Sequence, residues 1–134
     1  MGKNEHWIRG RKNLKEGKLE LAIRDFTEAI EIDSAVAKSF ADRGCAYARL
    51  GKYKEAEEDF KKAIKLDPAS AEAYCNLGKL YTESGRFAEA RNAYESALKL
   101  VPKFGSAHIF VMEGFASLEG AIAAAKAQAK IAKC

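Results

Sequence analysis

One constant spacing between small residues constrains the fold of this chain more than any other feature. Ala22, Ala56 and Ala90 follow this spacing. The same spacing of 34 residues relates three further sets. They are Gly10, Gly44 and Gly78; Gly17, Gly51 and Gly85; and Phe26, Phe60 and Tyr94. A period of about 34 residues, with small and large residues in a fixed order, is typical of a stacked helical repeat. Such repeats usually act through their surface, by holding another protein, and not through a catalytic pocket.

The period divides the chain into four windows, residues 3–36, 37–70, 71–104 and 105–134, and each is expected to form two antiparallel helices. In the third window an apolar stripe recurs at steps of three and four residues, as in an amphipathic helix, through Ala73, Tyr74, Leu77, Leu80 and Tyr81. Gly85 follows, where a helix end favours a left-handed backbone. Pro102 ends the second helix because it cannot continue the hydrogen-bond ladder.

Gly44 and Gly78 lie inside predicted helices, where glycine costs roughly 1 kcal/mol relative to alanine. Close helix approach would compensate for that cost. We expect Gly44 to let the first helix of its window touch the second near Ala56, and Gly78 to do the same near Ala90. Phe60 or Tyr94 would then fill the space beside these small residues.

The third window carries a family resemblance. Its pattern Tyr74-x-x-Leu77-Gly78-x-x-Tyr81, followed by Ala90-x-x-x-Tyr94 and then Pro102, resembles the tetratricopeptide repeat (TPR). The second window is nearly as close, with Gly44, Tyr47, Ala56, Phe60 and Pro68 at the matching places. The resemblance implies one all-α domain over residues 1–134, a right-handed α-α superhelix of about eight antiparallel helices.

Some positions depart from the family pattern. His6 and Asn13 replace expected aromatics in the first window, and Arg9 and Arg43 stand where leucine is usual. Terminal repeats are often atypical because one face meets water, which accounts for Arg9 better than for Arg43. We expect Arg43 to run its stem along the core and to place its charged head in solvent.

The fourth window matches only in part. Met112 occupies its glycine position, and residues 121–133 are rich in alanine with lysines at 126, 130 and 133. This segment, Ala121 to Lys133, is expected to form a separate capping helix with a solvated outer face. An acidic partner or an oligomer contact at this end is the alternative explanation for the lysines.

Composition is consistent with a folded soluble protein, since 48% of residues are hydrophobic and 31% are charged. The net charge of +4 is small and scattered, so we expect no nucleic acid partner. No apolar run near membrane-spanning length and no signal peptide core are evident, so the expected location is cytoplasmic, without membrane insertion. Cys45, Cys75 and Cys134 lack framework spacing and are expected to be reduced thiols.

Nothing in the chain suggests catalysis. His6 and His108 are the only histidines and occupy large-residue positions, which favours a structural role. No Cys/His pair has zinc-ligand spacing, and Gly78-Lys79 lacks the remainder of a phosphate loop. The sequence therefore predicts no enzyme activity, no catalytic residue, no metal and no cofactor.

The resemblance implies a concave side lined by the first helix of each repeat. Carried over by register, the predicted partner-binding residues on this side are Trp7, Arg11, Lys38, Asp42, Arg49, Asn76 and Lys79. Trp7 lies one place beyond the aromatic position, so we expect it to project toward the groove, where an exposed Trp near Arg is a typical hot spot. The alternative is that the first helix is rotated and Trp7 fills the place that His6 vacates.

One TPR subgroup clamps the C-terminal carboxylate of chaperones with lysine and asparagine at set places. By register those places are held here by Trp7, Arg11, Asp42, Glu72 and Asn76. Only Arg11 has a suitable charge, and the two carboxylates would repel a carboxylate ligand. The sequence argues against such a clamp.

The functional prediction is a scaffold that takes a peptide segment or a partner helix in its concave groove. The alternative is a structural protein that self-assembles into homo-oligomers, because Phe110, Met112 and the alanine-rich end could pack against another copy. Enzymatic function and RNA binding are disfavoured because neither a nucleophile–base pair nor a basic stripe with stacking aromatics is evident.

Overall fold

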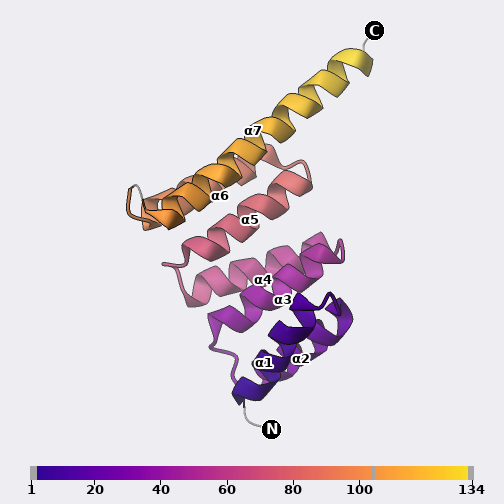
Figure 1. Ribbon diagram of the computed structural model, residues 1–134, viewed down its shortest axis with the longest axis vertical. Helices are drawn as coiled ribbons and strands as arrows, with labels where there is room; N and C mark the ends of the chain where they lie inside the picture. Colours follow the sequence, from indigo (N-terminus) through magenta and orange to yellow (C-terminus); the bar gives the residue numbers. More distant parts are fainter. Residues whose placement is uncertain (1–2, 104, 133–134) are drawn as a thin grey trace. The chain divides into compact units, whose positions relative to one another are not determined.

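The computed structural model describes residues 3–103 and 105–132. Within them the chain forms helices and no strand (Figure 1). The helices are α1 (Lys3–Lys15), α2 (Leu19–Ile32), α3 (Ala37–Arg49), α4 (Tyr53–Leu66), α5 (Ala71–Glu83), α6 (Phe87–Leu100) and α7 (Ser106–Ala132). The prediction of an all-α helical repeat is confirmed, and seven helices in the described part of the chain are close to the expected eight.

The helices fall into two compact units, residues 1–73 and residues 74–134. In the first unit α1 packs on α2, α2 on α3, and α3 on α4, which is the order of antiparallel hairpins placed side by side. In the second unit α6 packs on α7. That the two units form one domain over residues 1–134 stays a prediction.

Glycines end the first helix of each hairpin. Gly17, Gly51 and Gly85 have φ values of 78°, 80° and 78°. This left-handed conformation costs a residue without a Cβ very little. After α3 the backbone nitrogen of Lys52 donates to the carbonyl of Tyr47 at 2.9 Å, which closes the helix end. The turn expected at Gly85 is thus confirmed, and Gly17 and Gly51 form the same turn in the preceding repeats.

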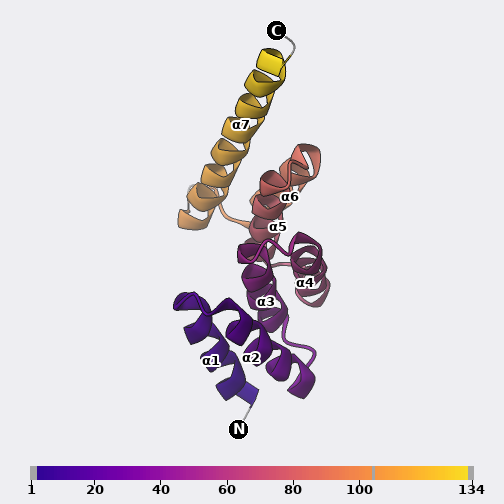
Figure 2. The ribbon, with the colours of Figure 1, turned by 90° about the vertical axis from the view of Figure 1, so that its right-hand side faces the viewer.

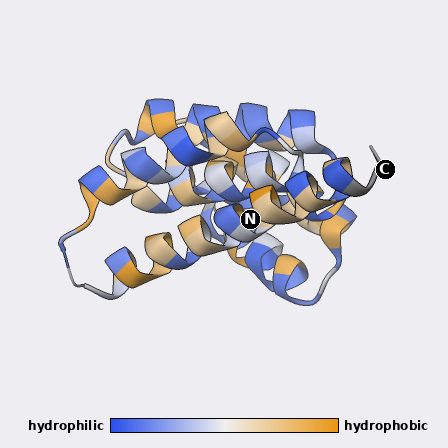
Figure 3. Ribbon diagram, turned by 90° about the horizontal axis from the view of Figure 1, so that it is seen from above, coloured by the Kyte–Doolittle hydropathy of each residue, from blue (hydrophilic) through white to orange (hydrophobic). Residues whose placement is uncertain are grey.

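The repeating alanines are fully buried between the helices. Ala22, Ala56 and Ala90 are each 0% exposed, and Phe26 and Phe60 are almost fully buried beside the first two. Figure 3 shows hydrophobic and hydrophilic residues on the same helices, as expected for helices with one buried stripe. A buried alanine leaves no room for a longer side chain at these places.

The glycines inside the helices lie against aromatic rings. A Cβ atom added at Gly44 would lie 2.8 Å from the ring of Phe60, and one at Gly78 would lie 2.9 Å from the ring of Tyr94. Gly10 has the same relation to Phe26, at 2.6 Å. The large residue of each window thus lies beside its glycine, as expected, and the close approach of Gly44 to Ala56 and of Gly78 to Ala90 stays a prediction.

Arg43 lies inside the first unit, and the prediction that its head reaches solvent is wrong. Its Nε donates to Asp59 Oδ2 and its second terminal nitrogen donates to Asp59 Oδ1, both at 2.8 Å. Asp59 is 5% exposed. The guanidinium also lies 5.6 Å from the ring centroid of Phe40. A buried carboxylate needs such a partner, and arginine is suited to this two-point contact.

The first hairpin has the same ion pair, at the matching positions of the preceding repeat. Arg9 Nε donates to Asp25 Oδ1 at 2.9 Å, and Asn13 donates to Asp25 Oδ2 at 2.7 Å. Asp25 is 0% exposed. In the third hairpin the two matching positions are Leu77 and Ala93, both buried. The repeat therefore accepts either an Arg–Asp pair or an apolar pair at this place.

The end of the chain differs from the prediction of a separate capping helix. One helix, α7, runs through from Ser106 to Ala132, whereas Lys133 lies outside the described residues. At the place of the turn glycines the fourth window has Glu119, which forms an ion pair with Arg91 at 2.9 Å. Glu119 does not favour a left-handed backbone, and Gly120 beside it stays within α7, so the alanine-rich segment continues as helix.

Only the first half of α7 is covered. Val111 and Leu118 are buried, whereas residues 123–130 are exposed, and this part extends past α6 in Figures 1 and 2. By length and composition alone, the stretch Ser106–Lys130 could cross a membrane. The predicted lack of membrane insertion stays a prediction.

Candidate functional site

A buried carboxylate ties α1 to α3 in the first unit. The indole nitrogen of Trp7 donates to Asp42 Oδ2 at 2.8 Å, and Arg11 donates to Asp42 Oδ1 at 3.1 Å. The side chain of Asp42 is 7% exposed, whereas that of Arg11 is 48% exposed. Asp42 thus accepts one hydrogen bond on each carboxylate oxygen, both from α1.

Two cations flank the Trp7 ring. The Arg11 guanidinium carbon lies 5.6 Å from the ring centroid, and the Lys38 ammonium lies 5.9 Å from it. Both distances fit cation–π attraction to the indole. Trp7, Arg11, Lys38 and Asp42, predicted separately as binding residues, thus form one cluster, which we call the Trp7 cluster.

Burial raises the pKa of the Asp42 carboxyl, although the hydrogen bond from Trp7 and the charge of Arg11 oppose that shift. The negative charge of Glu72 adds to the increase. The contact with Arg11 thus compensates only in part for the loss of water around Asp42.

Trp7 combines the two placements that the sequence left open. The half-buried ring packs against the core cluster of Ala22, Phe26 and Ala46. It also borders a surface hollow. His6 is half-buried as well, and its Nδ1 lies 2.8 Å from Glu28 Oε2. Trp7 is therefore partly a core residue and partly a surface residue.

Arg49 lies apart from the Trp7 cluster, at the other end of α3. Its guanidinium donates to the backbone carbonyl of Leu14 at 2.8 Å. This bond ties the last turn of α1 to α3. Its role as a binding residue stays a prediction.

The first unit has two hollows that are related by the repeat. The first hollow, of about 210 Å³, is lined by Asn4, Trp7, Ala29, Asp33, Val36, Lys38 and Ser39. The second, of about 230 Å³, is lined at the matching positions of the next repeat by Lys38, Ala41, Ala63, Asp67, Ser70, Glu72 and Ala73, and in addition by Ala37 and Asp42. Both lie where the first helices of consecutive repeats meet the turn between them.

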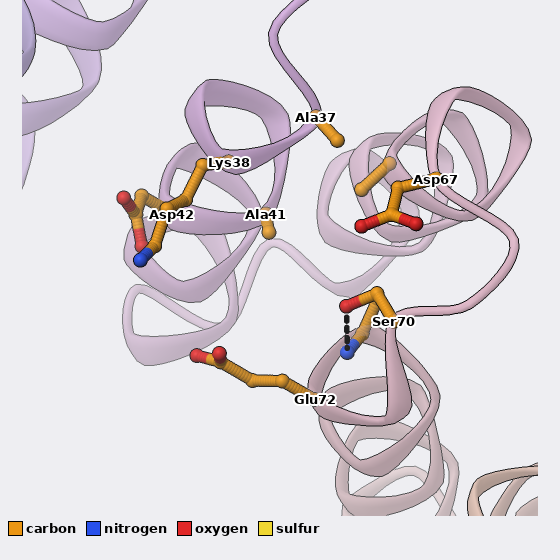
Figure 4. A pocket seen from close by; sticks show the side chains of 9 residues that line it. Ala37, Lys38, Ala41, Asp42, Asp67, Ser70 and Glu72 are labelled. Carbon is orange, nitrogen blue, oxygen red and sulfur yellow. Dashed lines mark hydrogen bonds between the residues drawn. The ribbon is translucent and has the colours of Figure 1, made fainter. Parts of the chain in front are cut away.

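The two hollows differ in shape and charge. Ala41 replaces Trp7 in the second hollow, and Glu72 replaces Lys38. Figure 4 shows Ala37 and Ala41 facing the second hollow, with Asp67 and Glu72 at its edge. The second hollow has alanine walls and three carboxylates, those of Asp42, Asp67 and Glu72.

The second unit holds a third hollow of about 290 Å³. Asn76 and Lys79 line it together with Cys75, Tyr94, Phe110, Glu113, Gly114 and Ser117. Gly114 matters because a Cβ there would lie 2.5 Å from the Tyr94 ring. Phe110 is 59% exposed and offers apolar surface beside Lys79. The predicted residues Asn76 and Lys79 thus share a site, and a groove common to both units stays a prediction.

The sequence analysis missed Asp67, Ser70 and Gly114 as residues of these hollows. Asp67 had a signal in the repeat, because Asp33 stands at the matching position of the preceding repeat. Both accept a hydrogen bond from the backbone two residues on, at 3.1 Å for Asp33 and 3.2 Å for Asp67. Gly114 had no such signal, since the glycine step predicts position 112.

The described residues contain no group of three or more His, Cys, Asp or Glu side chains placed to hold a metal ion. Cys45 and Cys75 are thiols that form no disulfide within this part of the chain, and Cys134 lies outside it. The hollows are lined by a mixture of small, aromatic, charged and amide side chains. Such surfaces recognise another chain by shape, charge and hydrogen bonds.

Comparisons with known proteins agree with this architecture. A model described as "TPR repeat" matches residues 44–83, and one described as "Tetratricopeptide repeat" matches residues 71–104. Among curated proteins none matches the chain. Among solved structures, the TPR2B domain of yeast Sti1 in a pHsp70 complex has a TM-score of 0.83 at 22% identity, covering 88% of this chain and 96% of its own.

Two similar structures are closer in sequence. The second TPR domain of human RPAP3, solved with the HSP70 peptide SGPTIEEVD, is 34% identical with a TM-score of 0.72, covering 84% of this chain and 96% of its own. The second TPR of Spaghetti (RPAP3), bound to the HSP90 peptide SRMEEVD, is 37% identical with a TM-score of 0.71, covering 74% of this chain and 92% of its own. The helical hairpins, the repeat models and these identities together show that the chain belongs to the tetratricopeptide repeat family.

Proposed function

We propose that this protein is a non-catalytic interaction module of the cytoplasm that holds a segment of a partner protein along α1, α3 and the start of α5. The observation that carries the proposal is the Trp7 cluster with a hollow on the first and second repeat steps. Half-buried Trp and exposed Arg are the residues most enriched at binding hot spots. The similar TPR structures, solved with peptides, support a peptide as the occupant.

We further propose that the segment is not held by its terminal carboxylate. At the clamp positions Asp42 accepts both the Trp7 and the Arg11 hydrogen bonds. A ligand carboxylate would have to displace Asp42 from its donors and approach Glu72 as well. Like charges at such short range in a partly buried site cost binding energy.

The proposed surface is tested by selecting binders from a displayed library of random peptides. Trp7 is the only tryptophan, so its fluorescence reports binding directly. We expect selected peptides to change that fluorescence and to bind Arg11→Ala and Lys38→Ala variants about tenfold more weakly, because hot-spot truncations cost more than about 1 kcal/mol. Lys54→Ala, on the exposed face of α4, is the control and should bind as the wild type does.

Equal affinity of the wild type and both cluster variants would reject the assigned surface. Failure to retain any peptide would reject a peptide-binding function altogether.

The proposal that the chain has no carboxylate clamp predicts how it binds acidic C-terminal peptides. We expect the wild type to show no saturable binding of SRMEEVD up to about 1 mM, a limit of roughly 4 kcal/mol of binding free energy. The double variant Asp42→Asn, Glu72→Lys should bind it measurably, because it removes two negative charges and adds a positive one. Isothermal titration with the peptide and with its C-terminal amide measures both. Micromolar binding by the wild type would contradict the proposal.

Self-assembly through α7 is the second candidate. Ile109, Phe110 and Met112 are 56%, 59% and 46% exposed, and exposed apolar side chains grouped in this way often mark contacts. Light scattering of the full chain over a wide concentration range separates the candidates, since only self-assembly gives a mass that rises with concentration.

A further inference from the structure

The second hollow differs from the first by substitutions that change the ligand it suits. Where the first hollow has Trp7, the second has Ala41, which leaves space. Where the first has Lys38, the second has Glu72, which reverses the charge. The repeat backbone thus forms two hollows at matching positions, and their side chains give them different shapes and charges. An extended partner segment that crosses both repeats would meet the two hollows one after the other.

The walls of the second hollow suit the stem of a long side chain. Four alanines line it, at positions 37, 41, 63 and 73, and all of them belong to the core cluster around Phe40 or pack against it. Methyl groups held on helices give a firm apolar surface. Lysine and arginine bury their methylene stems on such surfaces while their charged heads stay at a polar edge.

The edge of the hollow supplies the opposite charge. Glu72 is exposed, and no described residue forms a hydrogen bond or ion pair with its carboxylate. Asp67 is also exposed, and its carboxylate accepts only one backbone hydrogen bond, at 3.2 Å, among those described. Asp42 is already bound to Arg11 and Trp7. Lys38 is the cation lining the hollow, and its ammonium lies over the Trp7 ring.

Asp67 and Glu72 also have local structural roles. Asp67 caps the turn after α4, as Asp33 does after α2, and Glu72 stands in the first turn of α5, where an acid suits the helix dipole. The helix dipole does not require this residue, however, because α3 has Lys38 at the same place. Glu72 is therefore the residue that distinguishes the second hollow.

We propose that the second hollow binds a lysine or arginine side chain of the partner segment, with its stem on Ala41 and Ala63 and its charged head between Asp67 and Glu72. This inference rests on the proposed function and names the chemistry of its partner. It predicts a preference opposite to that of the similar structures, whose bound peptides are acidic at the end. Binding to an exposed pair of carboxylates should also weaken with salt.

The test uses the peptides selected on the wild-type chain. We expect them to share a lysine or arginine at one position, and replacement of that residue by methionine to weaken binding about tenfold, the size of a charge-assisted hydrogen bond. Glu72→Lys should weaken binding of the parent peptide by a similar factor and should favour a peptide with glutamate at that position. Glu58→Lys, the same change on the exposed face of α4, should have no effect.

The outcomes separate the two proposals. Peptides that depend on Arg11 and Lys38 but show no basic preference, or that bind Glu72→Lys unchanged, overturn this inference and leave the proposed function standing. If the library yields no peptide at all, both are overturned. Circular dichroism of Glu72→Lys is the control for folding. We expect the variant to be folded because Glu72 is exposed.

Discussion

Replacement of Ala56 by arginine is expected to unfold the first unit. Ala56 is 0% exposed in α4, and its counterparts Ala22 and Ala90 are equally buried. An arginine there would place an unpaired charge and a long side chain into a close-packed contact between helices. Overpacking and an unpaired buried charge each cost several kcal/mol. The free energy of unfolding of a small domain is only about 5–15 kcal/mol in total.

The measurement is circular dichroism at about 222 nm, where helices give a strong negative signal. The same signal is followed on heating to obtain the melting curve. We expect Ala56→Arg to lose a large part of the helical signal at room temperature or to aggregate. Glu58→Arg introduces the same side chain two positions away on the exposed face and should stay within about 0.5 kcal/mol of wild type. A wild-type melting curve for Ala56→Arg would refute the close packing that the alanine period implies.

Turns and buried stripes could be predicted from the sequence because each depends on local chemistry repeated at a fixed step. A glycine placed between two apolar stripes can end a helix with a left-handed backbone, and this combination predicted the turn at Gly85. The alanine step predicted the closest contacts for the same reason. The prediction failed in the fourth window, where Glu119 lacks the turn signal and α7 continues.

Long-range pairing was harder to predict. Arg43 and Asp59 lie on different helices, and an arginine alone at a leucine position suggests an exposed head. The sequence did hold a sign of the pair. Arg9 with Asp25 and Arg43 with Asp59 recur together, and both charges disappear together in the third repeat. Two repeat positions that are either both charged or both apolar indicate that their side chains are in contact. Inspection of single positions does not reveal this relation.

The Trp7 cluster was predictable in its members but not in their arrangement. Register placed Trp7, Arg11, Lys38 and Asp42 on one side of α1 and α3. It could not show that Asp42 binds Trp7 and Arg11, because three side chains from two helices meet there. The hollows are formed in part by the turns between helices. The helical period says nothing about where side chains in these turns lie, so the hollows could not be predicted from it.

Removal of one partner of the Arg43–Asp59 ion pair is expected to cause the second large loss of stability. Arg43→Leu should cost about 3–5 kcal/mol, because it leaves the buried Asp59 carboxylate without its partner. Asp59→Ala should cost a similar amount by stranding the guanidinium. The double variant Arg43→Leu, Asp59→Ala restores the apolar pair that the third repeat has in Leu77 and Ala93. Its stability should return to within about 1–2 kcal/mol of wild type, since apolar replacements of buried ion pairs are often neutral.

Urea denaturation of the four proteins at several pH values measures this cycle. Burial raises the pKa of Asp59, and the hydrogen bonds from Arg43 oppose the increase. Without Arg43 the folded state holds the Asp59 proton more tightly than the unfolded chain does. The deficit of Arg43→Leu should therefore shrink as pH falls from about 7 toward 5, whereas the double variant, with no carboxyl at this position, should show no such gain.

Additive single effects would refute the coupling, because the double variant would then lose about 6–10 kcal/mol, the sum of the two single losses. A deficit of Arg43→Leu that does not change with pH would show that Asp59 is not the group left unpaired. The loss would then come from the contacts of the Arg43 guanidinium with Phe40 and Tyr47, which lie 5.6 and 5.8 Å away. The pH series therefore separates the charge of Arg43 from its packing, which stability at a single pH cannot do.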